Sequence, residues 1–522
     1  MAAGRVQNRP GMSGGWKGED AGGVNRGSGP TWTVRIRVLY QTAFLGLFVW
    51  FLARLSAGDE RLFPYALFHH ADPLTAAAVP MGAGTLPGAL LWGIGLLLLT
   101  LVLGRVFCGW ICPFGTLQQL FSWILSPRTK RESLEANRWR PWFALKTYLL
   151  VALLVGAAFG SLQTGLLDPL SLLARGLSSG VWPLLPGGRA VPAGWLAAGL
   201  LLGFLIASRF IPRLFCRALC PLGAFLGLFA RFSLFRIGRG ASACTDCRLC
   251  SFACQGADEP LGSHRVAECH VCLSCLPKCP EGALTYGLLP ALPAPPRKPD
   301  LSRRALVGTA LGAAVVAPVL RVSGGGRDAA RAGLIRPPGA LGEKEFLSRC
   351  VKCALCQQTC PTGALQPAIG EAGVEGFWTP VVVPRRGGCE FACTRCGEVC
   401  PTGAIEPLPA ARKTGYDGRP PVRIGTAFVD KGKCLPWAMQ TPCIVCEEVC
   451  PTDPKAIWFD EVDEPLRGGA GTVHLKRPRI EPLRCVGCGI CENRCPVGEE
   501  AAVRVTSVGE TRDPLNRMLL AG

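Results

Sequence analysis

Most cysteines of this 522-residue chain stand in groups of four with regular spacing. Twenty-four of its 28 cysteines form six quartets, four with the pattern Cys-x2-Cys-x2-Cys-x3-Cys and two with a longer first gap. The regular quartets begin at Cys244, Cys269, Cys350 and Cys485, and the longer ones at Cys389 and Cys434. Three thiolates at this spacing wrap one loop around a [4Fe-4S] cluster. Zinc is the competing ligand for Cys-x2-Cys pairs, but the further cysteines and the Pro that follows most quartets favour iron–sulfur.

Neighbouring quartets are expected to exchange their fourth cysteine, which in two-cluster ferredoxins ligates the other cluster. A longer first gap still permits ligation, because loop-closure entropy rises slowly with length. We therefore predict about six [4Fe-4S] clusters. Their ligand sets are Cys244, Cys247, Cys250 and Cys279; Cys269, Cys272, Cys275 and Cys254; Cys350, Cys353, Cys356 and Cys400; Cys389, Cys393, Cys396 and Cys360; Cys434, Cys443, Cys446 and Cys495; and Cys485, Cys488, Cys491 and Cys450.

The four remaining cysteines form a repeated motif, Cys108-x3-Cys112-Pro and Cys216-x3-Cys220-Pro. Each motif follows an Arg-x-Phe triplet, and an Asp-Pro-Leu triplet precedes each copy at 72–74 and 168–170. Residues four apart share one face of a helix, so each pair is predicted to present two sulfurs together. If the copies face each other, four thiols converge. They could hold a metal or a further cluster, cycle between dithiol and disulfide, or simply pack as small residues at a helix end.

The elements that must position these cysteines include long apolar stretches. A mean hydropathy of +0.28 with only 18% charged residues is unusual for a soluble protein. Four stretches, at 38–55, 86–106, 142–161 and 193–208, approach the ~20 residues that cross a bilayer. The sequence therefore predicts a four-span α-helical membrane bundle built from two parallel repeats, with cluster-binding regions of the α+β bacterial-ferredoxin type attached.

The distribution of charge predicts the orientation. Residues 1–330 hold 32 Lys and Arg against 15 Asp and Glu, whereas residues 331–522 hold 24 against 22. The basic residues gather in the N-terminal tail and in the segments after the second and fourth apolar stretches, while the other two loops hold two each. The positive-inside rule places the basic segments in the cytoplasm. This pattern fits a multi-pass protein of the bacterial inner membrane better than a nucleic-acid-binding groove, and no cleavable signal peptide is evident.

A fifth apolar segment separates the two cysteine-rich regions. Ser302-Arg303-Arg304 precedes an Ala- and Gly-rich run that ends at Leu320. A paired arginine before such a run looks like a twin-arginine export signal placed inside the chain. We expect this segment to cross the membrane as a fifth span or anchor and to place the last third outside. The alternative is a helix on the cytoplasmic surface.

The predicted domains follow from these features. We expect a disordered cytoplasmic tail at 1–32, a four-span membrane domain with two Cys-x3-Cys-Pro motifs at 33–240, and a cytoplasmic two-cluster ferredoxin domain at 241–290. A linker with the twin-arginine-like segment follows at 291–325. A four-cluster ferredoxin domain, placed in the periplasm, completes the chain at 326–522.

These motifs resemble two known protein types. Residues 33–290 look like NapH, the membrane polyferredoxin of periplasmic nitrate reduction, and the membrane part is also similar to the NosR family. Residues 300–522 look like the exported NapG/MauM ferredoxin-type proteins. The resemblance implies quinol oxidation, with electrons passed from the quinone pool to a periplasmic reductase or c-type cytochrome. Finding both types in one chain departs from the usual two-subunit arrangement and leaves the final acceptor open.

Quinol oxidation also releases protons, so a proton acceptor is expected near the membrane. His69, His70, Asp72 and Asp168 lie in the predicted external loops and are the first candidates. The alternative is that the histidines are solvated and that each Asp-Pro opens a turn. Gln118 and Gln119 are a weaker quinol candidate on the cytoplasmic side.

Three functions stay open on the sequence alone. The first is a respiratory conduit from quinol or a cytoplasmic donor to a periplasmic acceptor. The second is an accessory protein that supplies electrons to mature or reactivate a periplasmic metalloenzyme. The third is a polyferredoxin that faces the cytoplasm throughout. Each is an electron carrier or a quinol-oxidising redox subunit rather than a stand-alone enzyme, and no nucleotide or flavin fingerprint is evident.

Overall fold

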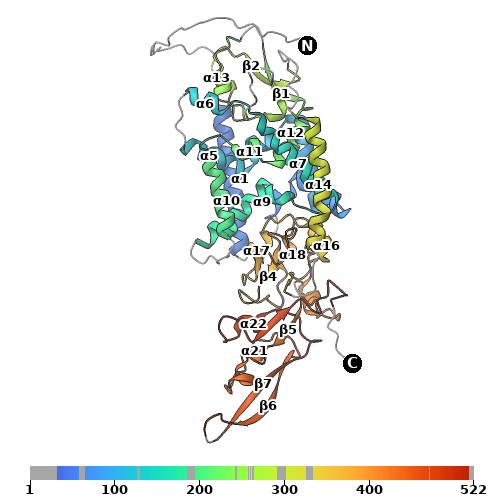
Figure 1. Ribbon diagram of the computed structural model, residues 1–522. Helices are drawn as coiled ribbons and strands as arrows, with labels where there is room; N and C mark the ends of the chain where they lie inside the picture. The colour runs from blue at the N-terminus through green and yellow to red at the C-terminus, as the bar shows by residue number, and fades with distance from the viewer. Residues whose placement is uncertain are drawn as a thin grey trace.

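The computed structural model describes residues 32–57, 65–125, 130–184, 194–240, 244–256, 258, 260, 264–290, 301–324, 333–469 and 471–516. The predicted tail, up to residue 31, and the linker at 291–300 lie outside these residues. The described chain is elongated, with three parts stacked along one axis (Figure 1). We call them the small ferredoxin segment (244–290), the helical domain (32–240) and the large ferredoxin domain (333–516).

Among the described residues, three helices are long and apolar enough to cross a membrane by length and composition. They cover Trp32–Ser56, Glu132–Ala158 and Arg303–Leu320. The first lies in α1 (Trp32–Ala57), the second includes α6 (Lys130–Ala136) and α7 (Leu145–Ala158), and the third lies in α14 (Arg303–Gly324). The stretches predicted at 86–106 and 193–208 instead form shorter apolar helices, α4 (Leu91–Leu103) and α10 (Gly194–Ala207). α4 ends at Gly104, whose φ of 77° is easy for glycine and stops the helix before Arg105.

Short helices fill the interior of the helical domain, and the repeat is visible in how they begin. α3 (Pro73–Ala83) and α9 (Pro169–Arg175) each start with Pro after a capping Asp. α5 (Pro113–Leu125) and α12 (Pro221–Ala230) each start with Pro after the second cysteine of a Cys-x3-Cys-Pro motif. Pro suits the first helical position because it has no N–H to leave unpaired. The remaining short helices are α2 (Leu67–His70), α8 (Thr164–Leu167) and α11 (Leu214–Ala218).

The ferredoxin regions consist of short helices and two-stranded antiparallel sheets. β2 (Leu284–Leu288) of the small segment pairs with β1 (Phe235–Arg239), which closes the helical domain, and α13 (Leu249–Phe252) lies between them in sequence. In the large domain the sheets pair β3 (Leu365–Pro367) with β4 (Pro380–Val382), β5 (Thr426–Val429) with β8 (Val503–Thr506), and β6 (Ile457–Pro465) with β7 (Thr472–Ile480). Its helices are α16 (Glu343–Arg349), α17 (Leu355–Thr359), α18 (Arg395–Glu398), α19 (Ala410–Thr414), α20 (Leu435–Ala438), α21 (Val445–Glu448) and α22 (Ile490–Arg494).

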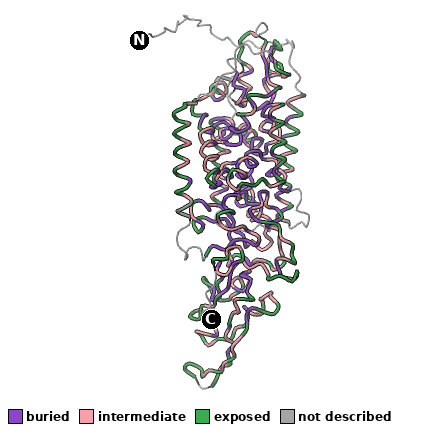
Figure 2. Tube along the Cα trace, turned by 90° about the vertical axis from the view of Figure 1, so that its right-hand side faces the viewer, coloured by how far each residue is buried: buried purple, intermediate pink, exposed green. Residues whose placement is uncertain are grey.

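One apolar core runs from the helical domain into the large ferredoxin domain. It joins Leu55, Phe114 and Phe215 of the helices to Val351 and Leu355 of the domain. Buried residues follow the long axis, and exposed residues lie on the outer helices (Figure 2). The interface is close-packed: a Cβ added to Gly165 would lie 1.7 Å from the carbonyl oxygen of Val351. The large domain is thus docked on the bundle by direct backbone contact.

Candidate iron-sulfur sites

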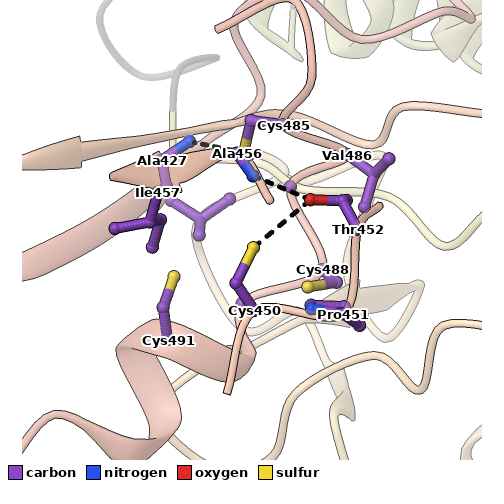
Figure 3. A pocket seen from close by; sticks show the side chains of 13 residues that line it. Ala427, Cys450, Pro451, Thr452, Ala456, Ile457, Cys485, Val486, Cys488 and Cys491 are labelled. Carbon is purple, nitrogen blue, oxygen red and sulfur yellow. Dashed lines mark hydrogen bonds between the residues drawn. The ribbon is translucent and has the colours of Figure 1, made fainter. Parts of the chain in front are cut away.

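The structure gathers the predicted cysteine sets, and three of them line pockets. Cys450, Cys485, Cys488 and Cys491 line one partly open pocket, and Figure 3 shows their sulfur atoms around it. Cys350, Cys353, Cys356 and Cys400 line a second pocket. Cys244, Cys247, Cys250 and Cys279 line a third. In each, the fourth cysteine comes from the neighbouring quartet, as the crossed pattern predicts.

The other three sets are close enough for their thiols to interact electrostatically. Cys254 and Cys275 interact with Cys272, as does Cys269. Cys389, Cys393 and Cys396 each interact with Cys360. Cys434 and Cys446 interact with Cys443 and Cys495. In these three sets too, cysteines of one quartet lie within electrostatic range of the last cysteine of the neighbouring quartet.

A backbone feature shared by the four regular quartets shapes their loops. The residues two and four positions after the first cysteine have positive φ. They are Asp246 and Arg248, Val271 and Leu273, Lys352 and Ala354, and Gly487 and Gly489. Alternating left-handed residues turn successive backbone N–H groups toward one point and create an anion-binding concavity. The sequence hides this feature, because only the last quartet uses glycine there; Val271, at φ 49°, is strained.

Burial disfavours ionisation of the thiols on their own. It raises the pKa of Cys254 to about 12, with Asp258 adding to the shift, and raises the pKa values of Cys350 and Cys434 to about 11. Bound metal ionises such thiols, since a coordinating thiol is deprotonated. Among the described residues, no three His, Cys, Asp or Glu side chains are arranged to hold a single metal ion. In three of the sets, four thiols line one pocket, and four cysteine thiolates are the ligand set of a [4Fe-4S] cluster.

The four cysteines of the repeated motif also converge. Cys112 interacts electrostatically with Cys108 and Cys216, and Cys220 interacts with all three. We call them the four-thiol set. The expectation that each pair lies on one helix is wrong. Cys108 lies in a π-helical turn (Phe107–Ile111), whereas Cys112 has an extended backbone just before Pro113. Pro disfavours a helical conformation in the residue before it, so the helix breaks at each Cys-Pro.

The second cysteine of each motif then stands at the start of the next helix. The N–H of Gly223 donates to Cys220 Sγ at 3.1 Å, and the backbone of Gly115 bonds Cys112 in the same way. Cys216 donates to the Gln118 side chain at 3.2 Å. A helix N-terminus favours a thiolate, so the helix break in each motif puts the second cysteine where its ionised form is stabilised.

The four-thiol set lies directly beneath the small ferredoxin segment. Arg105 donates to the Ala267 carbonyl at 2.7 Å, and Trp110 donates to the Val271 carbonyl at 2.9 Å. A Cβ on Gly109 would lie 2.2 Å from the carbonyl oxygen of His270, so only glycine fits there. These contacts join the loop of Cys108 to the loop that carries Cys269 and Cys272.

The residues proposed for proton exchange are buried inside the helical domain. Asp72 accepts from the N–H groups of Leu74 and Thr75, and Asp168 accepts from the N–H of Ser171. Both carboxylates therefore cap the helices that begin at the following proline, rather than only opening a turn. The histidines are not solvated loop residues: His69 is buried, with no hydrogen-bond partner recorded for its ring in the described part of the chain, and His70 is half-buried. Gln119 accepts from Gln41 and Arg213.

The charge pattern does not indicate that several arginines of the site are buried. Arg105, Arg213 and Arg217 belong to the basic segments that the positive-inside rule places in the cytoplasm, yet the side chains of all three are buried. Arg105 and Arg213 each precede the first cysteine of a motif by three positions. That equivalence is the signal that identifies them as part of the four-thiol site.

Family models agree with two of these regions. A 4Fe-4S binding domain matches twice, at residues 85–132 and 193–240, and each match contains one Cys-x3-Cys-Pro motif. A 4Fe-4S dicluster domain matches residues 441–499. No solved structure matches the chain.

Relatives cover different shares of the chain. The methylamine utilization ferredoxin-type protein MauM of Methylobacillus flagellatus is 34% identical over 217 residues, which is 40% of this chain and 80% of MauM. Protein NirI of Paracoccus denitrificans is 35% identical over 196 residues, 36% of this chain and 25% of NirI. The regulatory protein NosR of Pseudomonas aeruginosa is 31% identical over 258 residues, 46% of this chain and 32% of NosR. The chain thus spans a quarter to a third of NirI and NosR but most of MauM. It belongs to the family of membrane-associated 4Fe-4S ferredoxin-type electron-transport proteins that includes MauM.

Proposed function

We propose that this protein carries electrons across a membrane, from quinol or a cytoplasmic donor to a periplasmic reductase or c-type cytochrome. The observation that carries the proposal is that the cysteine sets form one continuous series. Cys250 interacts with Cys275, Cys356 with Cys396, and Cys446 with Cys491. The N–H of Cys389 donates to the Cys488 carbonyl at 2.7 Å. A [4Fe-4S] cluster held by each set would supply one-electron redox chemistry.

The helical domain connects the two ends of this series. Arg213 contacts both the Cys108 carbonyl and His270 of the small segment, each at 3.3 Å. On the opposite side, Cys112 lies within electrostatic range of Asp168, which interacts with Arg175. Arg175 donates to the Lys352 carbonyl at 3.0 Å and interacts with Cys353. The four-thiol set therefore stands between the small segment and the first set of the large domain.

The orientation is part of the proposal. The small segment faces the cytoplasm, where the basic loops are expected, and α14 carries the chain across so that the large domain lies in the periplasm. α14 packs along α7, and Tyr148 accepts from the Ser302 N–H at 3.1 Å. In this arrangement the Arg303 and Arg304 end stays on the cytoplasmic side.

Quinol oxidation is assigned to the interior of the helical domain. His69, Asp72 and Asp168 lie there, between the four-thiol set and the large domain, and Asp72 interacts with Asp168. His69 is the residue we favour for a hydrogen bond to quinol, because neither ring nitrogen has a hydrogen-bond partner within the described residues. Asp72 and Asp168 orient the helices that enclose it.

Three measurements test the proposal. Iron and sulfide analysis of the whole protein should give about 24 irons from the six sets, or about 28 with the four-thiol set, at ~4 per set. Reporter fusions after Pro290 and after Arg336 should report opposite compartments; the same compartment for both would exclude the transmembrane path. Reduction of the clusters by quinols in lipid should be seen by EPR, and no reduction at any quinol potential would remove the quinol step alone.

A second candidate is an accessory role, in which the same path supplies electrons for maturation or reactivation of a periplasmic metalloenzyme. The similarity to the regulatory protein NosR favours it. Deleting the gene separates the two. An accessory role predicts that the periplasmic enzyme lacks its complete metal centre, whereas the conduit predicts an intact enzyme that receives no electrons.

A further inference from the structure

Buried cations surround the four-thiol set. Arg105, Arg213 and Lys146 have exposed fractions of 0%, 1% and 3%. Glu268 is the carboxylate that pairs with two of them, with an N–O distance of 3.9 Å to Arg105 and a shorter one to Lys146. The contacts of Arg213 are to neutral groups: the Cys108 carbonyl, the Gln119 amide and the His270 ring. These three cations and Glu268 leave two positive charges. Asp168, which lies within electrostatic range of Cys112, interacts with a further cation, Arg175.

Each of these two arginines contacts the other copy of the repeat. Arg105, from the first copy, lies 2.8 Å from where a Cβ on Gly223 would stand, and it interacts with Cys220. Arg213, from the second copy, bonds the Cys108 carbonyl of the first. Arg105 also donates to Cys108 Sγ at 3.7 Å. Arg105 therefore faces thiols of both motifs, whereas Arg213 bonds the backbone of the first motif and lies within electrostatic range of Cys216 in the second. Lys146 lies within electrostatic range of Cys220.

Charge balance decides between the chemical states open to these thiols. Burying charge without a counter-charge is costly. Neutral thiols or disulfides would leave the excess positive charge uncompensated, whereas four thiolates provide the negative charge that the cations require. Thiolates persist in a buried site when a metal centre holds them.

We propose that Arg105, Arg213 and Lys146 form a fixed positive cage that keeps the four-thiol set as metal-bound thiolates and raises the reduction potential of the centre they hold. This inference rests on the proposed electron path and adds a seventh centre to it. Fixed positive charge favours the form with one more electron, and net charge around a cluster is one of the determinants of its potential.

The test compares neutral and charge-preserving variants of the full-length protein by EPR-monitored redox titration. Cys220→Ala first identifies the signal of this centre and should remove about four irons. Arg213→Gln should then lower its reduced-to-oxidised ratio at fixed potential at least tenfold, a shift of about 59 mV for a one-electron couple. Arg213→Lys should restore most of that ratio. Gly223→Ala, which displaces the Arg105 guanidinium, should produce a smaller shift in the same direction.

Two controls make the result specific. Arg231→Gln removes an exposed arginine from the same end of the helical domain and should leave every signal unchanged. Lys413→Gln removes a cation 3.5 Å from Cys389 Sγ and should move a different signal. If Arg213→Gln leaves the Cys220-dependent signal in place, the cage is wrong. If Cys220→Ala removes no iron while the six other sets stay loaded, the seventh centre is wrong and the proposed path loses only this member.

Discussion

The two ferredoxin regions are fastened to the same helical domain by different numbers of arginines: among the described residues, Arg37, Arg105, Arg213 and Arg217 contact the small segment, and Arg175 contacts the large domain. The small segment is held by long side chains that reach its backbone: Arg37 donates to the Cys272 carbonyl at 2.8 Å, and Arg217 donates to the Gln255 carbonyl at 2.8 Å. Close backbone packing occurs at both interfaces, with Gly165 against Val351 of the large domain and Gly109 against His270 of the small segment. Attachment through side-chain hydrogen bonds is weakened when a donor is removed. Attachment through close backbone packing is weakened when a side chain is added to the glycine.

Their internal ion pairs differ as well. In the small segment, His264 pairs with Asp258 at 2.6 Å, and both are buried. In the large domain, Glu343 pairs with Arg336 at 2.5 Å and with Arg512 at 2.9 Å, which joins the two ends of the domain. One pair depends on a group that loses its proton near neutral pH, and the other on a carboxylate that gains one in acid. The two regions should therefore fail at opposite ends of the pH scale.

The largest expected effect is on the close-packed interface. Gly165→Val would place side-chain atoms on the Val351 carbonyl and should weaken docking by about 3 kcal/mol. Hydrogen exchange at residues 350–355 should rise sharply, while exchange in the small segment should not change. Gly203→Ala is the matched control, because no atom lies within 4 Å of the added Cβ. Unchanged exchange in Gly165→Val would show that the interface does not depend on this contact.

The polar fastening should be lost one donor at a time. Arg217→Met removes hydrogen bonds to the Ala136 and Gln255 carbonyls and to Asn137. Leaving buried acceptors unpaired costs about 2 kcal/mol. Hydrogen exchange should increase around residues 250–256 and stay constant in the large domain. An equal increase in both regions would contradict the separation, and Arg231→Met serves as the exposed control.

The acid side of the comparison depends on Glu343. Burial opposes its charged form, but Arg336 and Arg512 outweigh burial and lower its pKa. A carboxyl with a lowered folded-state pKa stabilises the fold above its unfolded pKa of about 4.3, and this stability disappears as pH falls. Glu343→Gln should cost about 1–2 kcal/mol at pH 7. The loss should shrink toward pH 3 in thermal unfolding experiments; a loss independent of pH would exclude the ion pair as its cause.

The smallest expected effect is on the alkaline side. Burial opposes the charged form of His264, but Asp258 overcomes burial and raises its pKa. A raised folded-state pKa stabilises the fold fully below the unfolded pKa of about 6.5, and this contribution is lost as pH rises through the folded pKa. Hydrogen exchange around residues 264–268 should therefore increase between pH 6 and pH 9 beyond the intrinsic pH effect. His264→Gln should abolish that extra increase, and its persistence would point to another group.

The cysteine sets could be inferred from the sequence because ligand spacing along a loop is local information. Crossed grouping follows from the same rule, and the structure brings Cys279 beside Cys244 and Cys400 beside Cys350. The candidate spans at 38–55 and 142–161 could likewise be predicted from the length of their apolar stretches. The helix break at Cys112 is also predictable, because Pro113 disfavours a helical conformation in the residue before it. The four-residue spacing of the cysteines, taken alone, predicts one continuous helix.

Long-range features were not readable in the same way. A buried arginine and a surface arginine have the same letter, so Arg105 and Arg213 entered the charge count as cytoplasmic markers. The docking of Val351 on Gly165 joins positions 186 residues apart and leaves no local pattern. The left-handed loop residues are equally hidden, because Val271 and Leu273 are poor predictors of positive φ.

Helix α14 has a consequence for stoichiometry. It is mostly exposed along its length and packs chiefly on α7, so it adds little to the core of the bundle. Because α14 lies in the same chain as both regions, every helical domain nevertheless carries one large domain. A tether of this kind turns docking into an intramolecular event, with an effective concentration that reaches the millimolar range for short linkers. The interface around Gly165 can therefore stay occupied with an intrinsic affinity far weaker than two separate subunits would need.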